Sequence, residues 1–207
     1  MTSGQVAKQR LVEDSGIGED IPFTFIGWDD DVLVTMMSLG PEAMAMEVGQ
    51  RMPLVGAITE VMRKIYKADS LTFIAEGFIS RDAATRGKDL RAIFAAGNEQ
   101  VMECLSVCHV EINNFGEPDC TVISAPYSYV DAKNVAWYEM SYYEHGVGRV
   151  LRDSPFIAMM ALNLMSEAPS ISEEDYMAAL DALMMQGCLL HEFRDPEIDD
   201  DSPDGLI

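Results

Sequence analysis

Residues 71–79 read LTFIAEGFI, a run that is apolar on both alternating faces and rich in β-branched and aromatic side chains. This pattern predicts a strand buried on both sides, near the middle of a sheet. Three further runs follow it, at 101–112, 120–130 and 135–143, and short polar links separate them. Consecutive strands joined in this way form an antiparallel meander. The sequence therefore predicts an antiparallel sheet of about four to five strands.

Helices are predicted on either side of these strands. Apolar residues recur at helical spacing from Glu42 to Lys67, which predicts one long helix that Pro53 either kinks or divides. A short helix is predicted at 89–96. After the sheet, residues 156–165 and a segment beginning at Ser172 predict two more helices, the second with a stripe that continues to Leu190. The expected fold is thus α+β, with a long helix before the sheet and two helices after it.

Two segments precede the long helix. Residues 21–28 read IPFTFIGW and predict either a first strand or an extended segment pinned on the core. Residues 29–38 begin with three aspartates and continue with apolar side chains. Because acidic side chains are favourable near the positive end of a helix, this second segment predicts a short helix.

The chain of 207 residues is long enough for one large domain or two small ones, and no linker rich in Pro, Gly or Ser divides it. We expect a flexible lead at 1–20, one α+β domain at 21–194 and an acidic, disordered tail at 195–207. A chain of this length buries roughly 70% of its unfolded surface, so it can fold without metal or disulfides.

Charge is the strongest sign of a partner. The chain carries 35 acidic and 14 basic residues, a net charge of −21. Residues 167–207 hold 12 acidic residues against Arg194 alone, including the tail residues Asp199, Asp200 and Asp201. This charge repels nucleic acid and fits a basic protein surface. The tail is predicted either to keep the chain in solution or to act as an anionic arm that binds such a surface.

The four cysteines, at 104, 108, 120 and 188, are too scattered for the disulfide framework of a small secreted protein. Their spacing also lacks the paired knuckles of structural zinc sites. Residues 1–15 contain no apolar core of signal-peptide length, and no apolar stretch is long enough to span a membrane. The sequence predicts a cytoplasmic protein without a membrane segment.

Aromatic side chains gather on the last two predicted strands. Tyrosine and tryptophan bury a large area and keep a polar end, so they are common in contact surfaces. The predicted binding residues are Tyr127, Tyr129, Trp137, Tyr138 and Tyr142. The alternative is a half-exposed sheet covered by the C-terminal helices.

Polar residues interrupt the same strands and give the alternative candidate site. A carboxylate on an apolar strand needs a partner or has a raised pKa. If the strands are neighbours, the residues Glu76, His109, Glu111 and Glu139 could hold a divalent ion and support hydrolysis. The solvent face of an antiparallel sheet carries the same residue types, which is the competing interpretation.

Other motifs are absent or have the wrong geometry. Asp119, Asp131 and Lys133 match the literal spacing of the PD-(D/E)xK nucleases. Asp119 and Asp131 lie at opposite ends of one predicted strand, on the order of 40 Å apart, so they cannot share a metal ion. The chain has no nucleophile elbow, Walker loop, dinucleotide fingerprint or zinc-protease motif, so no cofactor is predicted.

The stretches IAEGFISRD, ECLSVCHVE and SAPYSYV resemble parts of small bacterial or bacteriophage accessory proteins, without any family motif, and they imply no activity. The sequence favours a non-enzymatic, cytosolic interaction or accessory protein that binds a basic protein surface or another copy of itself. A small metal-assisted hydrolase is the first alternative. A structural component that assembles as a homo-oligomer is the second.

Overall fold

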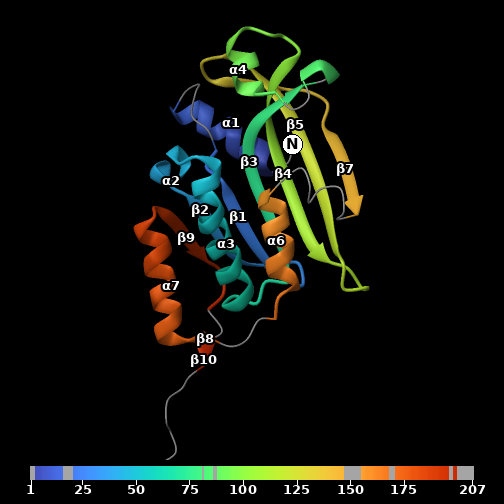
Figure 1. Ribbon diagram of the computed structural model, residues 1–207. Coiled ribbons are helices and arrows are strands. Elements are labelled where there is room, and N and C mark those ends of the chain that lie inside the picture. Colours follow the sequence, from blue (N-terminus) through green and yellow to red (C-terminus); the bar gives the residue numbers. More distant parts are fainter. Residues whose placement is uncertain are drawn as a thin grey trace, which may run out of the picture. The chain divides into compact units, whose positions relative to one another are not determined.

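The computed structural model describes residues 3–15, 21–80, 82–85, 88–146, 155–167, 171–195 and 198–199. The helices are α1 (Ser3–Ser15), α2 (Pro41–Ala45), α3 (Val48–Lys64), α4 (Leu90–Ala95), α6 (Pro155–Met165) and α7 (Glu173–Met185), with a 3₁₀ turn at Ala83–Thr85 (Figure 1). The strands are β1 (Thr24–Asp29), β2 (Val32–Leu39), β3 (Ser70–Ser80), β4 (Val101–Ile112), β5 (Pro118–Asp131), β6 (Asn134–Trp137), β7 (Ser141–Gly146), β8 (Ile171–Ser172), β9 (Cys188–Glu192) and β10 (Ile198–Asp199).

The α+β class with an antiparallel sheet is confirmed, but the predicted number of strands and the predicted order of the helices are wrong. The strands β1 and β2 precede the long helix α3, α4 lies between β3 and β4, and β9 follows α7. Hydrogen bonds link eight strands in the order β6-β5-β4-β3-β1-β2-β9, with β7 also paired to β5. The pairs β1–β2, β2–β9 and β5–β6 are antiparallel. The prediction of four to five strands was too low for two reasons. The strands β1, β2 and β9 lie in segments that were ambiguous or were assigned to helices, and the single strand predicted at 135–143 is divided into β6 and β7.

The chain is divided into two compact units. Unit 1 comprises residues 1–23, 74–108 and 121–144, and unit 2 comprises residues 24–73, 109–120 and 145–207. The strands β3, β4 and β5 contribute residues to both units. The domain boundaries expected from the sequence remain a prediction.

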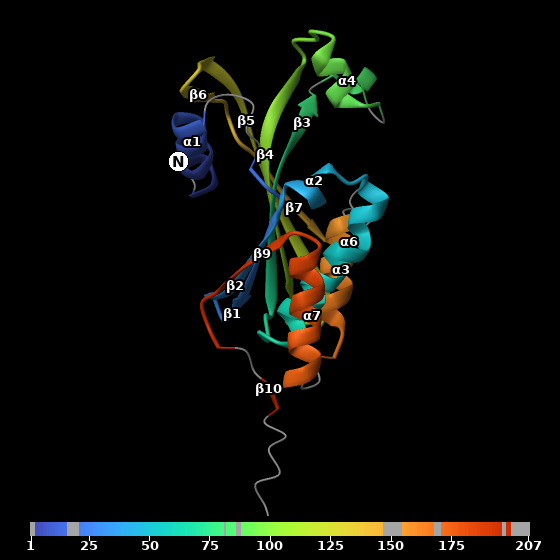
Figure 2. The same ribbon diagram turned by 90° about the vertical axis from the view of Figure 1, so that its left-hand side faces the viewer.

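Unit 2 packs its helices on one side of its strands. In Figure 2, α2, α3, α6 and α7 lie on the same side of β1, β2 and β9. Phe25 of β1 stacks on Phe73 of β3 with ring centroids 4.9 Å apart. The amide of Asn163 on α6 donates to the Gly56 carbonyl at 3.1 Å and to Thr59 Oγ1 at 2.6 Å, which ties α6 to α3. Each large apolar side chain buried here stabilises the fold by roughly 1.5–3 kcal/mol.

Unit 1 contains α1, α4, β6 and most of β7, together with parts of β3, β4 and β5. In Figure 2, α1 lies beside β6. The ring of Phe94 on α4 packs against Phe78 of β3 with centroids 5.1 Å apart. Asp89 begins α4 as its N-cap, and its carboxylate accepts from the backbone of Arg91 and Ala92. These contacts follow from the capping chemistry and apolar spacing of residues 89–96 and confirm the short helix predicted there.

The helix predicted at 29–38 was wrong, because these residues form a hairpin turn and β2. Asp30 and Asp31 have φ angles of 47° and 64°, and Asp29 pairs with Val32 across the turn. Two central residues with positive φ are typical of a type I′ hairpin turn, which matches the twist of the flanking strands. The acidic residues were read as a helix start, but they occupy a turn. Residues 32–39 instead form β2, which pairs with β1 and β9 and is largely buried from Val34 onward.

The helical segments also differ from the prediction in their bounds. The long helix expected from Glu42 to Lys67 is broken at Met46 and Glu47, and Pro53 lies inside α3. The helix that begins after Ser172 ends at Met185, and Gly187 has a φ of 79°. The following residues form β9 and pair with β2, so this end of the chain is part of the sheet.

Close backbone contact marks the junction of β2 and β9. The amide of Gly40 donates to the carbonyl of Gly187 at 2.6 Å. A Cβ atom placed at position 40 would lie 2.3 Å from that same oxygen. The contact is therefore available only to a residue without a side chain.

The first and last described segments form regular secondary structure. Residues 3–15 form α1, within the segment where a flexible lead is expected. Ile198 and Asp199 form β10, which pairs in parallel with β8. Asp200 and Asp201 lie outside the described residues. No described helix combines the length and the apolar character that crossing a membrane requires.

Candidate functional site

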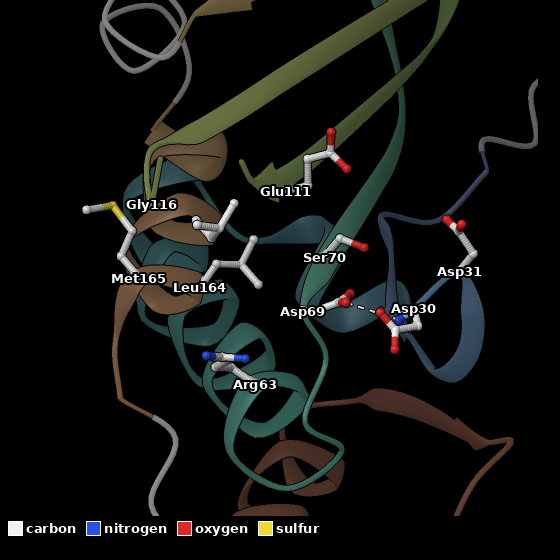
Figure 3. A pocket seen from close by; sticks show the side chains of 10 residues that line it. Asp30, Asp31, Arg63, Asp69, Ser70, Glu111, Gly116, Leu164 and Met165 are labelled. Atoms are coloured by element: carbon white, nitrogen blue, oxygen red, sulfur yellow. Dashed lines mark hydrogen bonds between the residues drawn. The ribbon is translucent and has the colours of Figure 1, made fainter. Parts of the chain in front are cut away.

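An acidic cavity of about 540 Å³ opens beside the β1–β2 turn of unit 2. Figure 3 shows Asp30 and Asp31 on the turn, Asp69 at the start of β3 and Glu111 on β4. Among the described residues that line the cavity, Arg63 of α3 is the one cation. The other lining residues are Ser70, Ile112, Gly116, Leu164 and Met165. We refer to this site as the acidic cavity.

Hydrogen bonds fix the walls of the acidic cavity. The backbone amide of Asp30 donates to Asp69 Oδ2 at 3.1 Å, and the amide of Asp69 donates to the Trp28 carbonyl at 2.8 Å. Arg63 Nη1 donates to the carbonyl of Ala68 at 3.1 Å, which holds the guanidinium near the end of α3. The turn and the start of β3 are thereby braced against each other.

One of the two central residues of the turn fits it poorly. Asparagine or aspartate followed by glycine is the favoured pair for a type I′ turn, because both central residues need positive φ. Asp30 therefore suits its position, whereas Asp31 occupies the position where glycine is usual, at a cost on the order of 1 kcal/mol. Both aspartates line the cavity. Strain of this kind is typical of positions selected for a site rather than for stability.

The charges leave the acidic cavity strongly negative. Asp29, next to the turn, forms an ion pair with Arg194 at 2.5 Å, so that cation is directed to a residue outside the lining. The lining contains four carboxylates, those of Asp30, Asp31, Asp69 and Glu111, and a single guanidinium, that of Arg63. Such an arrangement attracts ammonium and guanidinium groups. The described residues contain no group of three or more His, Cys, Asp or Glu side chains that could hold a metal ion.

His109 and Glu111 belong to a polar network on β1, β3 and β4. Trp28 Nε1 donates to Thr72 Oγ1 at 2.9 Å, and Thr72 Oγ1 lies 2.9 Å from His109 Nδ1. His109 Nε2 lies 3.9 Å from Glu111 Oε2. Because the indole can only donate, the Thr72 hydroxyl accepts a hydrogen bond from Trp28 and lies within hydrogen-bond distance of His109 Nδ1 as well.

Glu76 and Glu139, the other two predicted catalytic residues, lie in unit 1. Glu76 forms an ion pair with Lys8 of α1 at 2.9 Å, and these side chains are 6% and 0% exposed. Glu139 is exposed between β6 and β7. The described residues contain no cluster of side chains that could bind the metal of the predicted hydrolase. The metal-assisted hydrolase therefore remains a prediction.

Lys8 is enclosed by aromatic rings as well as by Glu76. Its Nζ lies 5.3 Å from the ring centroid of Tyr127 and 5.6 Å from that of Tyr129. Glu76 Oε2 also accepts from the backbone amide of Ile21 at 3.0 Å. Burial lowers the pKa of Lys8, but its interactions with Glu76 and Tyr129 together outweigh burial and raise the pKa overall. We call Glu76, Tyr127 and Tyr129 the lysine cage.

The predicted aromatic contact surface is divided by strand alternation. Tyr127 is buried, and its ring lies 5.3 Å from that of Trp137, its partner across β5 and β6. Tyr138 and Tyr142 are exposed, and the hydroxyl of Tyr138 lies 3.0 Å from Ser128 Oγ. The buried face of these strands packs against α1. The alternative prediction had the C-terminal helices covering this face. Burial raises the pKa of Tyr127, and the charges of Glu76 and Glu103 add to this effect.

The remaining motifs have structural roles. Asp119 Oδ2 accepts from the side-chain amide of Asn113 at 3.2 Å, and Asp131 Oδ1 accepts from the backbone amide of Lys133 at 2.8 Å. They lie near opposite ends of β5, as the distance argument required. The four cysteines are free and buried. Asp199 lies on β10, so of the three predicted tail residues it is the one that the structure describes.

Sequence reasoning missed two features of these sites. The turn at Asp30 and Asp31 had a signal, because two polar residues separate two runs with strand periodicity, 24–29 and 32–39. The pairing of Lys8 with Glu76 had none, because 68 residues separate them. An exposed lysine and a buried lysine look alike in a single sequence.

Comparison with known proteins gives no independent guide to these sites. The chain was compared with protein-family models, with curated proteins and with solved structures, and none of them matches. The function is therefore inferred from the acidic cavity, the lysine cage and the charge of the chain.

Proposed function

We propose that this chain is a non-enzymatic interaction protein, and that its acidic cavity binds a basic surface of a partner protein. The observation that carries the proposal is the lining of the cavity, in which Asp30, Asp31, Asp69 and Glu111 outnumber Arg63. A partner lysine or arginine entering the cavity would exchange water for several carboxylate oxygens. A charged side chain of this kind is the chemistry that the lining complements best.

The charge of the whole chain supports the same partner. With a net charge of −21, the chain attracts basic proteins over long range and increases the rate of encounter. The strained turn supports it locally, because Asp31 occupies a position where glycine would be more stable. Both observations favour a site selected for its negative charge. Because its cysteines are free, we further propose that the protein acts in a cytoplasm.

The experiment uses a fluorescent decalysine peptide as the basic probe and the double variant Asp30→Asn/Asp31→Gly. This variant removes two carboxylates and creates the favoured turn sequence, so weaker binding cannot be attributed to a damaged fold. The matched control is Glu174→Gln/Asp181→Asn, which removes two exposed carboxylates from α7. We expect the turn variant to bind about tenfold more weakly, and the control to differ from wild type by less than about threefold.

Salt gives a second measurement. Binding of the probe should weaken steeply between about 50 mM and about 300 mM NaCl, and the turn variant should show a shallower dependence. Equal binding by the turn variant and the α7 control would refute the acidic cavity as the site. Such a result would mean that the probe responds only to net charge.

Self-association is a second candidate function, supported by an exposed apolar surface at the end of the sheet. The strand β9 stands last in the order of strands, and its Leu189 and the adjacent Phe193 are 57% and 55% exposed. An exposed edge strand with apolar side chains can pair with a second copy. Because the net charge opposes self-association, salt should strengthen it, whereas salt weakens binding to a basic partner.

Light scattering at two protein concentrations distinguishes these candidates. Leu189→Lys places a charge on the edge strand and should abolish any dimer. Leu162→Lys, on the exposed side of α6, is the matched control and should leave the dimer intact. If the measured molar mass equals that of a single chain at both concentrations and in high salt, self-association is excluded.

A further inference from the structure

The lysine cage has the composition of a binding site for a primary ammonium group. It combines a carboxylate, that of Glu76, with the faces of two phenol rings, those of Tyr127 and Tyr129. Tyr129 also forms a hydrogen bond with Lys8. Ammonium groups bind to aromatic faces through the ring quadrupole, and the attraction is greater when water is excluded. In this chain the cage is filled by Lys8, which is fully buried.

The helix that carries Lys8 is held mainly by polar contacts. Gln9 donates to the Lys133 carbonyl at 3.2 Å and accepts from the Val135 amide at 3.2 Å. The described buried side chains of α1 are Gln5, Lys8 and Val12, of which only Val12 is apolar. A buried ion pair adds little net stability because both charges lose water. A helix of 13 residues is also marginal by itself.

The surface of β5 and β6 beneath α1 keeps a polar group without a hydrogen-bond partner among the described residues. Trp137 Nε1 is buried and has no hydrogen-bond partner among the described residues. Its ring packs against Tyr127, which lies beneath Lys8. A buried donor without an acceptor raises the free energy of the closed state. The docked helix therefore lies over an anionic, aromatic surface that still contains an unused donor.

We infer that the lysine cage is a binding site for a lysine side chain of a partner protein, and that α1 occupies it with Lys8 until such a segment displaces the helix. The occupant is a lysine-bearing segment of a partner, because Lys8 already identifies the side chain that the cage accepts. The site lies in unit 1 and does not depend on the acidic cavity of unit 2. Each proposal can fail without the other.

The test measures binding of peptides to the full chain. The first probe is a 13-residue alanine-rich helical peptide with one central lysine, and its matched control has norleucine at that position. The second probe is a peptide with the sequence of residues 3–15. We expect the Lys8→Ala variant to bind both lysine peptides at least about tenfold more tightly than wild type does, because the internal competitor is gone. The norleucine peptide should bind at least about tenfold more weakly.

Two further variants identify the site. Glu76→Gln in the Lys8→Ala background should remove the preference for lysine over norleucine. Arg10→Ala alters an exposed base of the same helix and should bind like wild type. Binding of the residue 3–15 peptide alone would overturn the proposal, because the site would then accept only the chain's own helix. Equal binding of lysine and norleucine peptides would also overturn it.

Hydrogen exchange of the wild-type chain tests the opening without any substitution. The amides of α1 should exchange faster than those of β3, β4 and β5, and the lysine peptide should accelerate them further. Exchange of α1 only together with global unfolding would overturn the proposal, since the helix would then be a fixed part of unit 1.

Discussion

The hydroxyl of Tyr66 donates to the carboxylate of Glu192, although 126 residues separate the two positions. The same carboxylate oxygen accepts from Tyr176 of α7 at 2.7 Å, and the two hydroxyls lie 3.2 Å apart. This small network joins the end of α3, the helix α7 and the strand β9. It links the C-terminal strand to the core of unit 2 through polar contacts.

Stability should fall at alkaline pH because of this network. Burial, then hydrogen bonding to Glu192, raises the pKa of Tyr66 above 10.0, and burial raises that of Tyr176 in the same direction. The folded chain therefore retains these protons to a higher pH than the unfolded chain does. Their stabilisation is complete below pH 10 and is lost as the pH rises above it. Urea unfolding at about pH 8 and about pH 11 measures the loss.

The Tyr66→Phe variant checks the assignment. It should lower the unfolding free energy by about 1–2 kcal/mol at neutral pH and flatten the alkaline dependence. Tyr138→Phe removes an exposed hydroxyl and is the control, which should keep the wild-type slope. A slope that is unchanged in Tyr66→Phe would count against the network as its cause.

The turn should become more stable when its aspartates are replaced. Asp30→Asn/Asp31→Gly supplies the sequence that positive φ favours at both positions. We expect a gain of about 1 kcal/mol in unfolding free energy, or a rise of roughly 2–4 °C in Tm. Differential scanning calorimetry measures the change. A lower Tm would show that the two carboxylates support the turn by contacts that outweigh its strain.

Loss of Lys8 should destabilise the chain only modestly. Breaking a buried ion pair that cannot relax costs about 3–5 kcal/mol, because one charge stays buried alone. If α1 can undock, Glu76 regains water and the cost of Lys8→Met is limited to about 2 kcal/mol. Urea unfolding gives the cost, and far-UV circular dichroism gives the lost helicity. A cost of about 4 kcal/mol would contradict an exchangeable helix.

The thiols should be unreactive in the folded chain. Burial raises the pKa of Cys120 and of Cys188 to about 11, and it raises the pKa of Cys104 as well. At pH 8 roughly 0.1% of such a thiol is the reactive thiolate. A disulfide reagent should therefore modify native protein slowly and all four cysteines quickly in urea. Rapid reaction of a native thiol would indicate that its segment opens often.

The sequence was most informative where one pattern had no competitor. The strand at 71–79 was predicted because both of its faces are apolar, and the strand at 101–112 because it is the first of three consecutive runs separated by short polar links. The strand β2 was missed because its three preceding acids resemble a helix start. The strand β9 was missed because the five residues CLLHE continue the apolar spacing of α7.

The candidate sites were predictable only in part. Charge and aromatic content identified an acidic chain with tyrosines on β5, but strand alternation and α1 decide which rings are covered. The acidic cavity collects residues from β3, β4, α3 and a turn, and the spacing of these residues along the chain does not reveal their proximity. Sites assembled from distant segments leave no local pattern.

The contact between Gly40 and Gly187 has a consequence for laboratory evolution. With a φ of −71°, Gly40 has a backbone that any amino acid can adopt, so only the space beside the Gly187 carbonyl restricts it. Even a methyl group there would force β2 and β9 apart. If every amino acid is tested at position 40 and the library is sorted for folded protein, only glycine should remain. The loss of the other residues would show that β9 is paired with β2 in the folded chain.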